Sequence, residues 1–205
     1  MKSSMNNVKL SMRYILPLLL LIFSAAGSYA QSFHLGLQAG ADFIRLGGRS
    51  FNNSYSTGFS GGVYSELNLN SHWGIQPELI YNETVATTSS DFNQILGGVS
   101  FQKVEVGYVS LPVLLAYRPV PELTILLGPQ FSYRVSETSG LIPGSNQDAF
   151  TKYDMGLLFG GQLNLGRVKI GARYIGGFTN LDNLGGNGDT WKTHGFQTYV
   201  GFRLF

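Results

Sequence analysis

The sequence of 205 residues contains no cysteine. This absence excludes a disulfide framework, a thiolate metal site, a cysteine nucleophile and a lipoprotein anchor. Charge is also scarce, because Asp, Glu, Lys and Arg make up 13% of the chain, against roughly 25% in a typical soluble domain. With 43% hydrophobic residues the chain is too apolar to be disordered. It must bury its apolar surface in a protein core or in lipid.

Long hydrophobic runs are missing as well. After residue 30 no apolar stretch reaches the roughly 18 residues that indicate a membrane-spanning helix, so helical spans are excluded there. The run Tyr14–Phe23 is too short for a retained anchor, and Ser28 and Ala30 fit the small-residue positions of a cleavage site. Three basic residues precede the run: Lys2, Lys9 and Arg13. We therefore predict a signal peptide over residues 1–30, cleaved after Ala30, and a single domain over residues 31–205.

The formal net charge of +2 belongs to this N-terminal segment. Removing its three basic residues leaves eleven basic and twelve acidic side chains, a net charge of −1. Such a chain lacks the positive field that nucleic-acid binding requires. We therefore expect no nucleic-acid partner.

Apolar residues alternate with polar or small ones along much of the remaining chain. From Phe33 to Phe43 every odd position is apolar, and no even position holds a large apolar residue. This period of two is typical of a strand with one apolar face. It marks eight segments of 9 to 13 residues: Phe33–Phe43, Phe59–Leu69, Trp73–Tyr81, Val109–Tyr117, Leu123–Val135, Tyr153–Leu165, Val168–Phe178 and Phe196–Leu204. A tilted transmembrane strand needs about 9–11 residues.

Short and long connections alternate between these segments. The short ones are 70–72, 118–122 and 166–167, and the long ones, rich in Ser, Asn, Gly and Thr, are 44–58, 82–102, 136–151 and 180–192. Short periplasmic turns and long extracellular loops are typical of outer-membrane barrels. We predict an all-β fold: an eight-stranded antiparallel up-and-down transmembrane β-barrel, exported to the outer membrane, with both mature termini in the periplasm.

Alternation alone does not tell a membrane barrel from a soluble lipocalin-like carrier, whose apolar face points inward. Many small residues on the polar face favour the membrane barrel, because a narrow eight-stranded interior has little room. Aromatic residues near the strand ends on the apolar face fit two interfacial girdles. The final Phe205 fits the aromatic C-terminus that barrel assembly machinery reads, so we expect that machinery as a partner.

Two features disturb the alternation. The apolar positions change parity between Val104–Tyr108 and Val109–Leu115, which predicts a bulge near Gly107–Tyr108. Pro77, Pro112 and Pro129 each remove a ladder donor within a strand. Because a closed barrel has no edge strand, these prolines predict local bulges or strand ends.

Five short segments resemble the PorT-like outer-membrane β-barrels of Gram-negative bacteria. They are Tyr108–Tyr117, Leu127–Tyr133, Tyr153–Gly161, Gly171–Leu181 and Val200–Phe205. The sequence departs from this family at Ser110, where the family has an acidic residue, and at Ile175–Phe178. The resemblance implies an eight-stranded barrel in the outer membrane, and it implies little chemistry, since most members have no assigned activity.

Charged residues fall on the polar, inward face of the predicted strands. They are Asp42, Glu66, Glu78, Asp154, Arg134, Lys152, Lys169, Arg173 and Arg203. Unpaired charges there would be costly, so we expect a hydrogen-bonded salt-bridge network that fills the lumen. A conducting path is the alternative, but eight strands leave space only for side chains. Glu105 and Lys103 would join the network only with the bulge.

Catalysis has one candidate residue. Some small outer-membrane barrels modify lipid A with a Ser, a His and an acidic residue near the outer rim. His194 is the one histidine predicted there, with Ser136, Ser139, Asp182 and Asp189 on neighbouring loops. A solvated loop histidine is the simpler interpretation. We therefore expect no enzyme activity, no cofactor and no metal, with lipid A acyl hydrolysis or transfer as the alternative.

The predicted long loops carry large apolar side chains among polar residues. They are Phe51, Tyr55, Phe92, Leu141, Ile142, Phe150 and Trp191. These side chains either pack onto the barrel rim or contact a glycan, lipopolysaccharide or an envelope protein partner. The sequence thus predicts a non-enzymatic outer-membrane barrel with a structural role in the envelope, or one that binds a ligand or partner through its extracellular loops.

Overall fold

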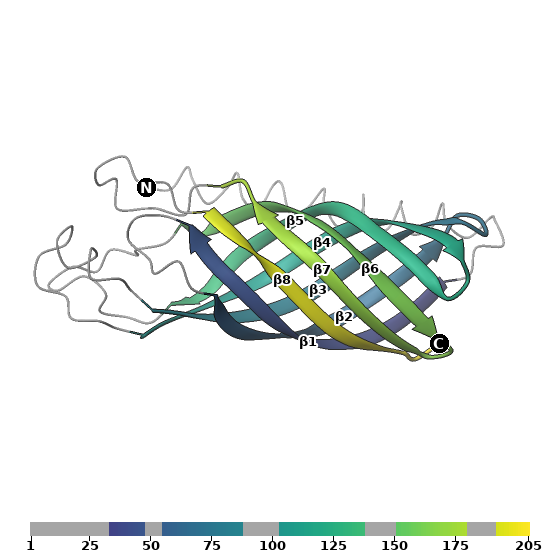
Figure 1. The fold of residues 1–205 in the computed structure, drawn as a ribbon, viewed down its shortest axis with the longest axis horizontal. Coiled ribbons are helices and arrows are strands. Elements are labelled where there is room, and N and C mark those ends of the chain that lie inside the picture. The colour runs from purple at the N-terminus through teal and green to yellow at the C-terminus, as the bar shows by residue number, and fades with distance from the viewer. Residues whose placement is uncertain (1–32, 48–54, 88–102, 138–150, 180–191) are drawn as a thin grey trace, which may run out of the picture. The chain divides into compact units, whose positions relative to one another are not determined.

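The computed structural model describes residues 33–47, 55–87, 103–137, 151–179 and 192–205, which lie within one compact unit, Phe33–Phe205. They form eight strands: β1 Phe33–Gly47, β2 Ser56–Asn68, β3 Trp73–Thr87, β4 Lys103–Val120, β5 Leu123–Glu137, β6 Tyr153–Leu165, β7 Val168–Gly177 and β8 Lys192–Arg203. Each strand pairs antiparallel with the next, and β8 pairs with β1 to close the barrel (Figure 1). The predicted fold is confirmed.

The strand ends agree with the prediction more closely at the short-turn end of the barrel than at the long-loop end. At the short-turn end, β1, β3, β5 and β7 begin and β6 ends at the predicted residues. Gly166 takes the left-handed φ of 65° in the tight β6–β7 turn. At the long-loop end, β3 continues to Thr87 and β4 starts at Lys103. Strand pairing continues here beyond the lipid-facing belt. Because the strands need no apolar face outside lipid, the alternation of apolar and polar residues ends before the strands do.

The two faces of the barrel have opposite character. Apolar side chains point outward and stay exposed, among them Leu37 at 50% and Phe159 at 57%. Polar side chains point inward and are buried, among them Gln76 at 1% and Glu78 at 2%. The described residues contain no helix that is long and apolar enough to cross a membrane. A lipocalin-like carrier needs an apolar interior that binds ligand, so this alternative is wrong.

Aromatic side chains pair across neighbouring strands at both ends of the outer face. At the short-turn end, ring centroids are 4.7 Å apart for Trp73–Tyr117 and 6.3 Å for Phe33–Phe205. At the opposite end, the pairs are Phe59–Tyr81, Tyr133–Tyr153 and Tyr174–Phe196. These pairs mark the two edges of the apolar belt, as in outer-membrane barrels.

Two lumen tyrosines fit only because glycine lies opposite each of them. Tyr64 pairs with Gly36 across β1 and β2, and Tyr199 pairs with Gly171 across β7 and β8. A Cβ atom at Gly171 would lie 2.2 Å from the Tyr199 ring, and one at Gly36 would lie 2.4 Å from the Tyr64 ring. The glycines on the polar face therefore make room for aromatic rings that fill the lumen.

We expect Gly171→Ala to lower the free energy of unfolding by about 1–3 kcal/mol, because the added methyl group overlaps a ring that is buried and held in place. The urea midpoint of the folded barrel in detergent measures this loss. Gly161→Ala is the matched control, since the nearest atom to its Cβ would be 4.0 Å away. Equal midpoints for the two variants would show that the Tyr199 ring moves freely.

A register shift occurs where the bulge was predicted, near Gly107–Tyr108 of β4. The additional residue belongs to the neighbouring strand β5 and not to β4. The β4–β5 register changes between Gly107 and Tyr108, where Val135 of β5 has no counterpart. The β3–β4 register is the same on both sides of this point. Tyr108 therefore keeps its inward parity, and Glu105 points outward and is exposed.

The predicted bulges or strand ends at Pro77, Pro112 and Pro129 are wrong. The strands β3, β4 and β5 continue through these prolines, and the register is the same before and after each one. Each proline itself pairs with the following strand: Pro77 with Val113, Pro112 with Gln130 and Pro129 with Leu157. Towards the preceding strand, each proline lies in a two-residue interruption of the ladder. A proline therefore removes one local donor without disturbing the barrel.

Candidate functional site in the lumen and at the outer rim

A buried ion pair crosses the middle of the lumen. Arg173 of β7 donates from Nη1 to both carboxylate oxygens of Glu78 on β3, at 2.9 and 2.8 Å. Its Nε donates to Gln197 at 2.5 Å, and its guanidinium carbon lies 4.9 Å from the centroid of the Tyr199 ring. Both charged side chains are almost completely buried. The pair thus joins opposite walls of the barrel.

Neutral side chains also donate hydrogen bonds to two lumen carboxylates, Glu78 and Asp42. Gln38 and Gln76 each donate to Glu78, at 2.8 and 2.9 Å. Asp42 accepts from three neutral donors: Ser60 at 3.0 Å, Asn82 at 3.0 Å and Gln197 at 2.6 Å. Such donors stabilise buried carboxylates in an interior that excludes water.

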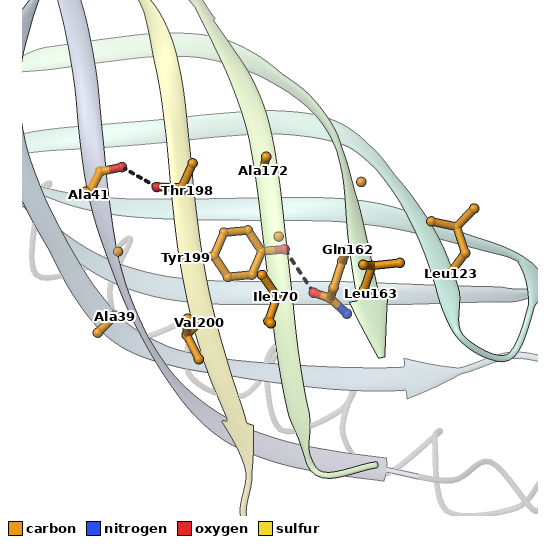
Figure 2. A pocket seen from close by; sticks show the side chains of 13 residues that line it. Ala39, Ala41, Leu123, Gln162, Leu163, Ile170, Ala172, Thr198, Tyr199 and Val200 are labelled. Atoms are coloured by element: carbon orange, nitrogen blue, oxygen red, sulfur yellow. Dashed lines mark hydrogen bonds between the residues drawn. The ribbon is translucent and has the colours of Figure 1, made fainter. Parts of the chain in front are cut away.

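A second ion pair lies nearer the short-turn end. Lys169 of β7 is 2.5 Å from Glu66 of β2, and both are buried. The Tyr199 hydroxyl donates to Gln162 at 2.9 Å between the two ion pairs (Figure 2). The lumen is therefore filled by side chains over several successive levels.

The other part of the lumen wall is apolar, which the alternation along the strands did not predict. Leu114, Leu126 and Leu158 are at most 1% exposed, and they cluster with Ile44, Ala116 and Ile175. Each leucine belongs to a Leu-Leu doublet on β4, β5 or β6, in which one residue faces lipid and the other the lumen. These Leu-Leu doublets are the sequence signal that indicates an apolar part of the lumen wall.

The predicted charge network falls into three groups in the structure. Asp42, Glu78 and Arg173 come together in the middle of the lumen, and Glu66 pairs with Lys169 nearer the short-turn end. Arg134 and Asp154 lie around Tyr108 towards the long-loop end, and Arg203 lies at the opposite end. Lys152 precedes β6 and is exposed, so its assignment to the lumen is wrong. The inward–outward alternation of β6 does not apply to Lys152, because the strand begins one residue later, at Tyr153.

Of the predicted loop contacts, the structure describes Tyr55, while Phe51, Phe92, Phe150 and Trp191 lie outside the described residues. Tyr55 belongs to an outward-facing rim cluster: Arg45, Tyr55, Tyr174, His194 and Phe196. Arg45 lies opposite His194 in the β1–β8 ladder, and its guanidinium carbon is 5.9 Å from the centroid of the Tyr55 ring. The Tyr174 hydroxyl is 3.3 Å from His194 Nδ1. The cluster places two basic side chains among aromatic rings.

The catalytic alternative finds no support in this geometry. Within the described strands, the ring of His194 has a hydrogen-bond partner in Tyr174 and none in a serine or a carboxylate. Ser136 lies in β5, and Ser139, Asp182 and Asp189 lie outside the described residues. The described part of the chain also contains no group of three or more acidic or histidine side chains that could hold a metal ion.

Small side chains leave a depression in the outer wall. It has a volume of about 540 Å³ and is lined by residues of β1, β5, β6, β7 and β8, among them Ala39, Ala41 and Ala172 beside Thr198 and Val200 (Figure 2). The Thr198 hydroxyl points to the Ala41 carbonyl at 3.5 Å. Its lining also includes Gln162 and Tyr199, whose hydrogen bond lies in the lumen.

Comparison with known proteins agrees with this geometry. Residues 29–183 match the family model described as outer membrane protein beta-barrel domain. No curated protein matches the sequence.

The fold is similar to Neisserial surface protein A, with 15% identity and a TM-score of 0.54 over 85% of this chain and 99% of that chain. It is also similar to Ail of Yersinia pestis in complex with the heparin analogue sucrose octasulfate, with 16% identity and a TM-score of 0.52 over 84% of this chain and 99% of that chain. Because the family model covers most of its length, the chain belongs to the outer membrane protein β-barrel family and is an outer-membrane protein.

Proposed function

We propose that the protein is a non-enzymatic, non-conducting surface barrel that binds anionic groups of lipopolysaccharide at its extracellular end. In this proposal residues 1–30 are a cleaved export signal, residues 31–205 are the mature barrel, and the chain is a PorT-like member of its family. The C-terminal strand engages the barrel assembly machinery. The alternating short and long connections orient the rim cluster towards the cell exterior.

The rim cluster is the observation that carries the proposal. Arg45 and His194 stand side by side on the outward face, close to the aromatic pair Tyr174–Phe196 that marks the edge of the apolar belt. Basic side chains at this level meet the headgroups of the outer leaflet, where phosphate groups form charge-assisted hydrogen bonds with them. A ligand at this site needs no access to the lumen, which is filled by the Arg173–Glu78 pair and its neighbours.

Ail of Yersinia pestis shares the fold and was solved with a sulfated heparin analogue. A barrel of this kind can therefore hold an anionic ligand. In the present chain Arg45 of the rim cluster supplies the complementary positive charge, and His194 stands beside it as a further hydrogen-bonding group.

We expect Arg45→Gln combined with His194→Gln to weaken binding of lipopolysaccharide vesicles about tenfold or more, because each charge-assisted hydrogen bond contributes over 1 kcal/mol. Binding is measured on the purified barrel at about pH 6 and constant ionic strength. Lys152→Gln is the matched control, because Lys152 is exposed and stands outside the cluster. Unchanged binding by the double variant would contradict the proposal.

A further inference from the structure

The short-turn end of the lumen is lined by basic side chains. His34 of β1, Arg118 of β4, Lys169 of β7 and Arg203 of β8 continue the inward-facing positions of their strands. Lys169 is buried, and the other three are half-buried. We call these four residues the basic mouth. This end faces the periplasm in an outer-membrane barrel, because the short turns lie there.

Strand register brings the basic mouth together. His34 pairs with Glu66, and two residues along β1 Gly36 pairs with Arg203. Lys169 pairs with Gly201, so Arg203 is its diagonal neighbour on the same face. Arg118 approaches from β4, where its guanidinium nitrogens lie 3.3 Å from the position of a Cβ atom on the buried Gly74. The charges of both arginines act on His34 and on Lys169.

The basic mouth is not neutralised by the described part of the chain. Glu66 is the one carboxylate among the described inward-facing residues of this end, and it pairs with Lys169. The guanidinium groups of Arg118 and Arg203 have no side-chain acceptor or carboxylate within the described strands and turns. Residues 1–32 contain no Asp or Glu that could supply one.

Among the described residues, no other charged group at this end forms an ion pair with the basic mouth. Glu122 lies exposed in the β4–β5 turn, where its carbonyl accepts from the Asn164 N–H. The main-chain oxygen of Phe205 accepts a hydrogen bond from the Leu35 N–H at 3.1 Å. Arg167 and His72 in the neighbouring turns are also basic in type and exposed. In contrast, Arg173 in the middle of the lumen has both oxygens of Glu78 and one of Gln197 as acceptors.

We propose that the basic mouth binds an oxyanion, a phosphate or carboxylate group, presented from the periplasmic side. Two guanidinium groups suit such a group, because each presents a planar fork of N–H donors to its oxygens. The protein walls of the narrow opening focus the field of these charges. The bound anion stays at the opening, since the Arg173–Glu78 pair and Tyr199 fill the lumen beyond it. This site lies at the opposite end of the strands from the rim cluster and does not depend on the function proposed there.

The test is calorimetric titration of the full purified barrel in a non-ionic detergent, at constant ionic strength. Inorganic phosphate is one probe, and an N-acetylated, C-amidated Glu-Glu dipeptide is the other, with the Gln-Gln peptide as its neutral reference. We expect saturable binding of at least one anionic probe. Arg118→Gln combined with Arg203→Gln should weaken it about tenfold or more. Binding of phosphate alone identifies a phosphate site, and binding of the Glu-Glu peptide alone identifies a carboxylate site.

Arg167→Gln is the matched control, because it removes a positive charge from the same end but outside the basic mouth. We expect this variant to bind as the wild type does. The double variant should unfold at the same urea concentration as the wild type or a higher one, since it removes repulsion between like charges, so lost binding would not result from misfolding. No saturable binding of either probe, or equal weakening by Arg167→Gln, would overturn the proposal.

Discussion

Replacing Arg173 with methionine is expected to lower the free energy of unfolding by about 3–5 kcal/mol, because it leaves a buried carboxylate without its cation. Glu78 is 2% exposed, and its remaining donors, Gln38 and Gln76, are neutral. Methionine keeps much of the volume of the side chain, so the loss reports on charge more than on packing. Urea unfolding of the folded barrel in detergent, followed by heat-modifiable migration on gels, measures the effect.

A second substitution tells a charge effect from a volume effect. Arg173→Met combined with Glu78→Gln removes both charges, and we expect it to recover most of the lost stability, since replacing a buried ion pair as a whole is often close to neutral. Lys152→Met, at an exposed position before β6, should have no measurable effect. If the double variant is as unstable as Arg173→Met alone, the ion pair is not the cause. Conductance of porin scale through the wild type in planar bilayers would contradict a lumen filled at this level.

The inward position of the central charges could be predicted from the sequence, but their partners could not. Parity along each strand places Glu78 and Arg173 on the same side of the sheet, and closure of the barrel makes that side the lumen. Which two charges meet depends on their heights along different strands, which follow from strand stagger rather than from alternation. Glu78 and Arg173 are 95 residues apart in the chain and come from β3 and β7. Only the three-dimensional register brings them together.

Alternation also fails where both faces of a strand are apolar. Leu157 and Leu158 are adjacent, and the first is 41% exposed while the second is 1% exposed. A pattern that sorts residues into apolar-out and polar-in cannot place such a doublet. Alternation therefore predicts a lumen filled by paired charges, whereas the lumen has a polar part and an apolar part. The sequence likewise shows many small residues on the polar face of the strands. It does not show which glycine lies opposite Tyr64 and which lies opposite Tyr199.

Substitution of Leu157 by arginine is the second change with a large expected effect. Leu157 lies near the middle of β6 on the outward face, between the aromatic pairs that mark the two edges of the apolar belt. An arginine on the lipid face of a barrel costs about 2–4 kcal/mol at the bilayer midplane and about 0–1 near the interface. We expect the higher range here, measured by urea unfolding in phospholipid vesicles.

Val135→Arg is the depth-matched comparison for this substitution. Val135 is 51% exposed on the outer face of β5, beyond Tyr133 and close to the long-loop end, so its arginine reaches the headgroups and should cost no more than about 1 kcal/mol. Leu157→Phe keeps an apolar side chain in the belt and should be tolerated. The difference in free energy of unfolding between the two arginine variants depends on the bilayer. It should disappear when unfolding is repeated in a short-chain detergent that stays soluble in urea, because charged side chains stay hydrated there. Equal costs in vesicles would mean that the belt between the aromatic pairs is not the part of the barrel that lies in the hydrocarbon layer.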